Sequence, residues 1–377
     1  MKKFTGAGIA LLLGTTAAYA GGMDRSGQSI TALFEEGTYA EISFGSVSPD
    51  VTGVGAAGTT TSGNVAPEYT QLGLAYKTDI NDQFSIALIV DQPFGASVSY
   101  DNIPYALQGT KADVTTMGYT FLAQYHVDEN VSVFAGPRLI SAEGTYTRSF
   151  LNTSSLPNSI TVYDATYSSD TDVGYVVGAA YEIPEIALRA AITYSSQTEF
   201  SLDGQGSFMG GAAAATTLEA IMPQTVNVDF QTGAAANTLA FANFRWADWS
   251  EAILKDNFAN STFTPPASNT DLGVLSDFNN TDVTTYTVGI GRRFSDNFGA
   301  QFAVGYENAT RQAAGNLAPT DGYISYSCGG AYTFENGMEM SGGIRYVDLG
   351  DTTTQTLASS FTKNSVTAIG LKLAYHY

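Results

Sequence analysis

The sequence has few charged residues and a single cysteine, and no long apolar run follows its N-terminal region. Asp, Glu, Lys and Arg make up 14% of the 377 residues, well below the roughly 25% usual in soluble globular domains. The one cysteine, Cys328, excludes an intrachain disulfide framework. After residue 20 no stretch approaches the ~18 consecutive apolar residues of a membrane-spanning helix, which excludes a helical-bundle membrane protein.

Positive charge is the scarcest kind of charge. Sixteen Lys and Arg stand against 36 Asp and Glu, which gives a formal net charge of −20 at pH 7. A chain this acidic is repelled by nucleic acid and by anionic membrane surfaces, so we expect no nucleic-acid partner. In place of charge the sequence has 39 Gly, 22 Tyr and 21 Phe, with a mean hydropathy of −0.02. This composition is typical of an outer-membrane β-barrel.

The first residues have the features of a secretory signal peptide. Lys2 and Lys3 form a short positive region, and residues 9–13 are the centre of an apolar stretch. Small residues at Ala18 and Ala20 suit a signal peptidase. The alternative is an N-terminal membrane anchor, but the apolar stretch is shorter than the ~20 residues that a spanning helix needs. The sequence therefore predicts a signal peptide over residues 1–20.

The rest of the chain alternates apolar with small or polar residues. In residues 297–309, for example, Phe298, Phe302 and Tyr306 share one face of a strand and Gln301 lies on the other. Apolar side chains that face lipid and polar ones that face an interior are expected of a membrane barrel. A soluble β-sandwich has the same period, but its polar face would normally carry Lys and Glu. The fold class that we predict is all-β, a transmembrane antiparallel up-and-down β-barrel.

About 14 strands can be counted, and short turns alternate with long polar loops, which requires an even number of strands and both termini on the periplasmic side. The final strand ends in Tyr375 and Tyr377; aromatic residues at such positions are the usual signal for barrel assembly. Because lipid offers no hydrogen bonds to a free sheet edge, the last strand must pair with the first. The predicted strands lie near 38–47, 67–78, 83–91, 113–127, 131–147, 162–181, 185–197, 217–232, 236–247, 282–294, 297–309, 321–334, 337–348 and 364–377. The predicted long loops lie near 48–66, 92–112, 148–161, 198–216, 248–281, 310–320 and 349–363.

Several segments resemble the FadL/TodX-type outer-membrane transporters of long-chain fatty acids and other hydrophobic compounds. Residues 39–53 (YAEISFGSVSPDVTG) resemble the family's first strand and the proline-containing start of its first loop. Residues 79–95 (DINDQFSIALIVDQPFG) resemble its turn, third strand and Pro-Phe-Gly step. Residues 244–250 (FRWADWS) are similar to its tryptophan pair closing a middle strand, and residues 334–346 and the final strand also fit.

The resemblance implies a 14-stranded barrel whose lumen is blocked by an N-terminal plug, the hatch. It also implies capture of substrate by the long loops, an internal apolar pocket, and sideways exit at a kink in the third strand. Only residues 21–37 precede the first strand, so a short hatch is expected there, with the barrel over residues 38–377. The family's Asn-Pro-Ala step is absent, and residues 27–34 stand in the corresponding region.

The alternation places several charged residues on the inner face. We predict that Arg138 and Arg245 face the ligand, where they could pair with a substrate carboxylate. The alternative is that the inner basic residues pair with inner carboxylates and brace the wall. The predicted inner residues are Lys77, Asp91, Arg138, Arg189, Asp229, Arg245, Glu307, Arg345 and Lys372, with Glu41 as a further carboxylate partner.

Two other segments are candidates for the transport path. Pro93 removes a donor from the sheet and Gly95 permits unusual torsions, so strand pairing should loosen there. This predicts the lateral-exit kink; the alternative is simply the top of a strand turning into a loop. In the hatch, apolar side chains could cap an internal pocket or could merely pack against the wall. The kink residues are Asp91, Pro93, Phe94 and Gly95, and the hatch residues are Ile30, Leu33 and Phe34.

The apolar residues of segments 98–107 and 205–222 predict a binding surface on the loops, with loop–loop packing as the alternative. Trp246 and Trp249 fit an outer aromatic girdle, with ligand stacking as the alternative. Cys328 falls on the lipid-facing register.

Catalysis finds no support in the sequence. His126 and His376 are the only histidines, and neither has the setting of an activated nucleophile or of a metal site. We therefore predict no enzymatic activity, no metal and no cofactor.

The function that we predict is passive uptake of hydrophobic small molecules, foremost long-chain fatty acids, across the outer membrane. A general diffusion porin for small polar solutes is the alternative, although porins usually have about 16–18 strands. The expected partners are the hydrophobic ligand, outer-membrane lipid and lipopolysaccharide, and the barrel-assembly machinery through the C-terminal strand. We expect a monomer.

Overall fold

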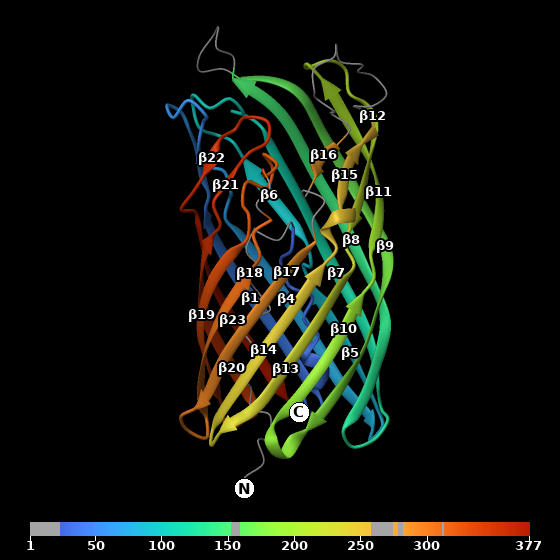
Figure 1. Ribbon diagram of the computed structural model, residues 1–377. Helices are drawn as coiled ribbons and strands as arrows, with labels where there is room; N and C mark the ends of the chain where they lie inside the picture. The colour runs from blue at the N-terminus through green and yellow to red at the C-terminus, as the bar shows by residue number, and fades with distance from the viewer. Residues whose placement is uncertain (1–22, 152–158, 258–273, 278–281, 311–312) are drawn as a thin grey trace.

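The computed structural model describes residues 23–151, 159–257, 274–277, 282–310 and 313–377 (Figure 1). The predicted signal peptide over residues 1–20 lies outside these residues. No helix in the described ranges is long and apolar enough to span a membrane.

Fourteen antiparallel strands close into a barrel, as predicted. The first strand, β1 (Tyr39–Asp50), pairs with the last, β23 (Ser365–His376), along its whole length. On its other side β1 pairs with β4 (Tyr69–Asn81). The junction of first and last strand therefore leaves no free edge, which lipid would not tolerate. The other uninterrupted wall strands are β7 (Lys111–His126), β8 (Val131–Leu151), β9 (Ser159–Ile183), β18 (Phe298–Glu307), β19 (Tyr323–Thr333) and β20 (Met338–Leu349).

Other wall strands are interrupted, so that two consecutive segments together cross the wall. Neighbouring segments continue the same ladder: β10 pairs with β13, and β11 pairs with β12. The interrupted strands are β5 (Phe84–Asp91) with β6 (Gly95–Ser99), β10 (Leu188–Ser195) with β11 (Thr198–Phe208), β12 (Ala214–Met222) with β13 (Thr225–Ala235), and β14 (Thr238–Ala247) with β15 (Ile253–Asp256). The segments β16 (Val274–Asp277) and β17 (Val283–Arg293) pair with β15 and β14 in the same way, and residues 278–281 between them lie outside the described ranges.

The predicted loop over residues 198–216 is wrong, because β11 and the start of β12 occupy it. The partner of β11 on its other side is the upper part of β9, from Gly204↔Tyr167 to Phe208↔Tyr163. Pairing with the neighbouring strands therefore sets how far this strand extends. The predicted loop surface at 205–222 is wrong for the same reason, since Leu218 and Met222 are buried inside the barrel.

The outer face of the barrel is apolar. Along β23, Ile369, Leu371 and Leu373 are 53%, 57% and 42% exposed, whereas Ala368 and Ala374 are buried. Exposed apolar side chains in such numbers would make a soluble protein aggregate, but they suit a surface in contact with lipid. Cys328 is also exposed, in agreement with its predicted register.

Loops cover part of the barrel end that lies opposite the C-terminus (Figure 1). A small sheet forms there, in the order β21-β22-β2-β3. The rings of Tyr100 and Tyr105 stack with centroids 5.5 Å apart, and the Tyr105 hydroxyl donates a 2.8 Å hydrogen bond to Ser359. Val98, Tyr100 and Tyr105 are thus buried among loops, which is the loop–loop packing alternative. The strands of the small sheet are β2 (Thr52–Val54), β3 (Thr61–Asn64), β21 (Thr352–Thr353) and β22 (Ser360–Phe361).

Candidate functional site

The third wall strand is interrupted where the sequence predicts it. β5 pairs with β7 up to Asp91↔Gly118, and pairing resumes with β6 at Gly95↔Thr115. Pro93 lies in between and has no backbone N–H to donate. Because both segments keep their pairing with β7, the interruption affects the other side of the strand, which faces β4.

A gap in the wall results on that side. The pairing of β4 with β5 begins at Leu74↔Val90 and runs from there to the turn that joins the two strands. Above this point, residues 69–73 of β4 pair with β1 but have no second strand partner among the described residues. The side chain of Gln92 compensates in part, since its Oε1 accepts a 3.3 Å hydrogen bond from the backbone N–H of Leu72. The wall is therefore closed here by side chains and not by a backbone ladder.

The N-terminal segment (residues 23–38) covers the gap from inside the barrel. The Arg25 N–H donates to the Pro93 carbonyl at 2.9 Å, and the Gly95 N–H donates to the Met23 carbonyl at 2.8 Å. The Arg25 guanidinium lies 4.2 Å from the ring centroid of Tyr69 on β4. A Cβ atom on Gly95 would lie only 2.6 Å from Arg25 Nε, so a larger residue here would force the guanidinium to move.

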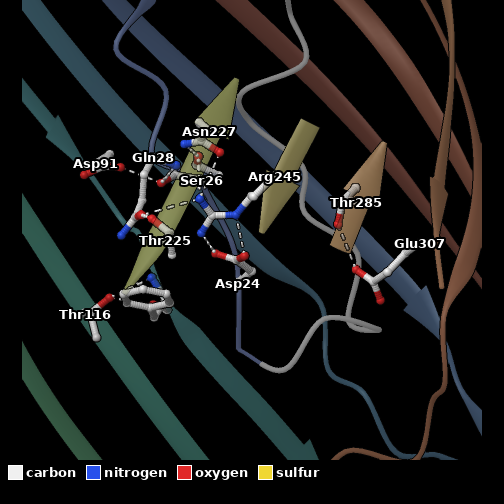
Figure 2. A network of polar contacts seen from close by, with 12 residues as sticks. Asp24, Ser26, Gln28, Asp91, Thr116, Thr225, Asn227, Arg245, Thr285 and Glu307 are labelled. Atoms are coloured by element: carbon white, nitrogen blue, oxygen red, sulfur yellow. Dashed lines mark hydrogen bonds and ion pairs between the residues drawn. The ribbon is translucent and has the colours of Figure 1, made fainter. Parts of the chain in front are cut away.

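Arg245 on β14 holds the same segment from across the lumen (Figure 2). Its Nε and Nη2 each donate a 2.7 Å hydrogen bond to the Asp24 carboxylate, and its Nη1 donates to the Gly27 carbonyl at 3.2 Å. Nearby, Thr225 donates to the Gln28 side chain at 2.7 Å. Arg245 faces inward as predicted, but its contacts are with the N-terminal segment.

Arg138 makes the other inner ion pair of this region. Its Nη2 lies 3.2 Å from Asp91 Oδ1, and Ser26 of the N-terminal segment donates to Asp91 Oδ2 at 2.5 Å. This is the pairing that the sequence left open as the alternative to ligand contact. The Arg138 Nε is buried without a hydrogen-bond partner among the described residues, and contact of Arg138 with a ligand stays a prediction.

The predicted hatch residues pack against the wall. Ile30 and Leu33 are 5% and 0% exposed; Ile30 precedes the short 3₁₀ helix η2 (Thr31–Phe34), and Leu33 lies within it. The rings of Phe34 and Phe134 meet edge to face at 5.9 Å, and the Arg189 guanidinium lies 4.8 Å from the Phe34 ring centroid. These contacts match the packing alternative, and a role of these residues in capping a ligand remains a prediction.

An apolar cluster begins at the first residue of the N-terminal segment and fills the part of the barrel where several strands are interrupted. Phe94 and Trp249 meet edge to face at 5.8 Å, and Trp249 is fully buried. The placement of Trp249 in an outer girdle is therefore wrong. β14 ends at Ala247, and the 3₁₀ helix η4 (Trp249–Glu251) carries the indole into the cluster. The cluster also contains Met23, Ile140, Ala142, Tyr163, Ala165, Tyr167, Phe200, Leu202, Leu218, Ala220, Met222, Ala252 and Leu254.

Sequence reasoning missed most of this cluster. Phe200 and Leu202 recur on one face of β11 at period two, which was a signal for a strand. The predicted loop over residues 198–216 did not take this alternation into account.

Trp249→Leu should lower the free energy of unfolding by about 2 kcal/mol, because it removes much of a fully buried aromatic side chain. Denaturant unfolding of the refolded barrel measures this change. Trp246→Leu is the matched control, since Trp246 is only partly buried, and it should cost less than about 1 kcal/mol. Equal losses for the two variants would contradict the placement of Trp249 in the cluster.

One carboxyl group of the N-terminal segment, that of Glu35, has a raised pKa. Burial raises the pKa of Glu35 from 4.5 to about 7. Lys372 and Arg189 act against this shift, and Glu339 and Glu41 add to it. Because the pKa is raised in the folded state, protonation favours docking of the segment. This contribution is complete below pH 4.5 and is lost as the pH rises through about 7.

Amide protection factors in residues 30–38 should therefore be about tenfold higher at pH 5 than at pH 8. Hydrogen exchange followed by mass spectrometry, corrected for intrinsic exchange rates, measures them. Glu35→Gln should remove the difference between the two pH values. Equal protection in the unmodified protein at both pH values would argue against the burial of this carboxyl.

The same architecture is found in known proteins. Residues 14–376 match the family described as outer membrane protein transport protein (OMPP1/FadL/TodX). No curated protein sequence gives a significant match. Among solved structures, a FadL homologue of Pseudomonas aeruginosa is similar, with 14% identity, a TM-score of 0.73, and coverage of 96% of this chain and 98% of that chain.

Two toluene transporters share the fold as well. TodX of Pseudomonas putida is 12% identical, with a TM-score of 0.63 and coverage of 96% of this chain and 95% of that chain. TbuX of Ralstonia pickettii is 13% identical, with a TM-score of 0.60 and 90% coverage of both chains. At such identities the structures show a common fold alone, whereas the family match spans nearly the whole sequence. The chain belongs to the OMPP1/FadL/TodX family, and it is a non-enzymatic outer-membrane β-barrel that transports hydrophobic compounds.

Proposed function

We propose that the chain takes up long-chain fatty acids or hydrophobes of similar shape, and that they leave sideways through the gap between β4 and β6. The observation that carries this proposal is how the gap is closed. Residues 23–25, which do not belong to a wall strand, cover it through two backbone hydrogen bonds to Pro93 and Gly95. A wall that had only to be sealed would use a continuous strand.

The apolar cluster supports a path from the extracellular end to this gap. Several of its members lie on β11 and β12, strands that belong to the half of the barrel opposite the C-terminus (Figure 1). Its members Phe94 and Met23 lie at the gap itself. Each methylene buried along such a path contributes about 0.8 kcal/mol. Capture by the loops and passage inward therefore need no energy source.

The inner arginines fit a carboxylate ligand in this proposal. Arg245 and Arg138 each already bind a carboxylate, Asp24 and Asp91. A ligand carboxylate would exchange with Asp24 or bind the remaining Nε donor of Arg138. Exchange at Arg245 would loosen the N-terminal segment and so uncover the gap.

A direct test is to identify the ligand and measure its uptake. Gently purified protein should retain acyl-chain compounds that native mass spectrometry detects, and cells that express it should gain uptake of radiolabelled long-chain fatty acid. A large single-channel conductance in planar bilayers, with passage of small polar solutes and no retained hydrophobe, would overturn the proposal in favour of a diffusion porin. The N-terminal segment lying across the lumen (Figure 2) speaks against that porin.

A further inference from the structure

A pocket with a cavity volume of about 90 Å³ lies beside the gap. Inner residues of β1, β4, β5 and β23 line it together with four residues of the N-terminal segment, among them Ser26 and Ser29. Leu72 and Val90, whose side chains belong to the lipid side of the wall, line it too. The pocket therefore lies where lumen and outer face meet, and it has room for several water-sized groups.

Gln71 on β4 is the unusual residue of this pocket. Its side chain lines the pocket, the residue is only 5% exposed, and neither its Nε2 nor its Oε1 has a hydrogen-bond partner among the described residues. Buried amides without partners are rare in folded proteins because both groups lose their water. Gln71 thus places an amide with two N–H donors and a carbonyl acceptor, unpaired among the described residues, beside the pocket.

The charged groups of the pocket, in contrast, are already engaged. Lys372 Nζ lies 3.3 Å from Glu41 Oε2 and donates a hydrogen bond to the Tyr39 hydroxyl. The Asp91 carboxylate is bound by Arg138. An anionic ligand would find the Lys372 ammonium group already paired with Glu41. It would also be repelled by the Asp91 carboxylate. A neutral group avoids this repulsion and can use both atoms of the amide.

We propose that Gln71 is the specificity-determining contact of a head-group site at the gap, and that this site selects an uncharged group able both to donate and to accept a hydrogen bond. A primary alcohol and a protonated carboxylic acid have this chemistry. The apolar tail of the ligand would extend past Leu72 and Val90 toward lipid. The inference rests on the proposed lateral path and adds to it a preference for the form of the ligand that enters a membrane.

The test compares ligands that share a C16 chain. Binding of hexadecan-1-ol, hexadecane and hexadecane-1-sulfonate to the purified full-length barrel is measured by competition in native mass spectrometry. The unmodified protein should bind the alcohol about tenfold more tightly than the alkane and more tightly than the sulfonate. Gln71→Leu, which keeps the side-chain volume, should abolish the preference for the alcohol. Gln71→Lys should shift the preference toward the sulfonate.

Gln301→Leu on β18 is the matched control. The Oε1 of Gln301 is also buried without a partner among the described residues, but Gln301 does not line the pocket. This variant should keep the preference for the alcohol. Folding of each variant is checked by heat-dependent electrophoretic mobility, and Gln71→Leu alone decides the matter if Gln71→Lys does not fold.

A preference for the alcohol that persists in Gln71→Leu, or tighter binding of the sulfonate by the unmodified protein, would overturn the inference. If the unmodified protein takes up fatty acid but binds all three ligands equally, the head-group site is refuted and the transport function stands. If it neither binds nor takes up any hydrophobe, both are refuted.

Discussion

Uptake of hydrophobic compounds should fall to background when strand three is made continuous by Pro93→Thr and Gly95→Val. Thr restores the missing backbone donor and Val favours the extended conformation. A side chain at position 95 would displace the Arg25 guanidinium, which would weaken the docking of residues 23–25. A continuous strand could then pair with residues 69–73 of β4 and close the gap permanently.

The rate of radiolabelled fatty-acid uptake by whole cells measures this effect, with surface expression determined in parallel. Pro223→Thr is the matched control, because Pro223 also lies at a strand interruption, between β12 and β13, but away from β4. We expect it to leave uptake unchanged. Uptake at the original rate in the Pro93/Gly95 variant would refute lateral exit.

Arg245→Met should release the N-terminal segment and raise ion conductance through the barrel. In the docked segment the largely buried Asp24 carboxylate would lack its cation, and breaking such a pair costs about 3–5 kcal/mol. The barrel itself should stay folded, since its ladders do not depend on this pair. Single-channel recordings in planar bilayers measure the conductance, and hydrogen exchange measures the loss of protection in the N-terminal segment.

Two further variants make this test specific. Asp24→Asn combined with Arg245→Met should recover part of the lost protection, because no unpaired charge remains. Lys255→Met is the control at an exposed pair, where Lys255 and Glu219 lie 3.5 Å apart with side chains 44% and 54% exposed; exposed pairs contribute about 0–1 kcal/mol. A closed, fully protected barrel in Arg245→Met would contradict the anchoring role.

The barrel and the interruption of strand three could be predicted because both depend on patterns in the local sequence. Period-two alternation marks a strand with one face in lipid, and the sequence around Pro93 marks where its ladder must fail. The inner position of Arg245 also follows from this alternation. Its partner does not, because Asp24 lies 221 residues away and only closure of the barrel brings the two together.

The interrupted strands β10 to β15 were harder to predict for a related reason. Local propensity for a strand is weak in a segment such as β12, which begins with Ala214 and Ala215, and pairing with its neighbours determines its extent. Trp249 shows the same limit. An indole side chain suits a lipid interface, but the short turn of η4 places this one inside the barrel.

The anchoring of the N-terminal segment has a consequence for the order in which the molecule is assembled. The groups that hold it belong to strands distant in sequence, namely Pro93, Asp91 and Arg245. They form one binding site only after the barrel has closed, and contacts between such distant residues are slow to form. The N-terminal segment, although it is synthesised before the strands that hold it, is therefore expected to dock last, and a barrel that has closed before this docking would have an open lumen.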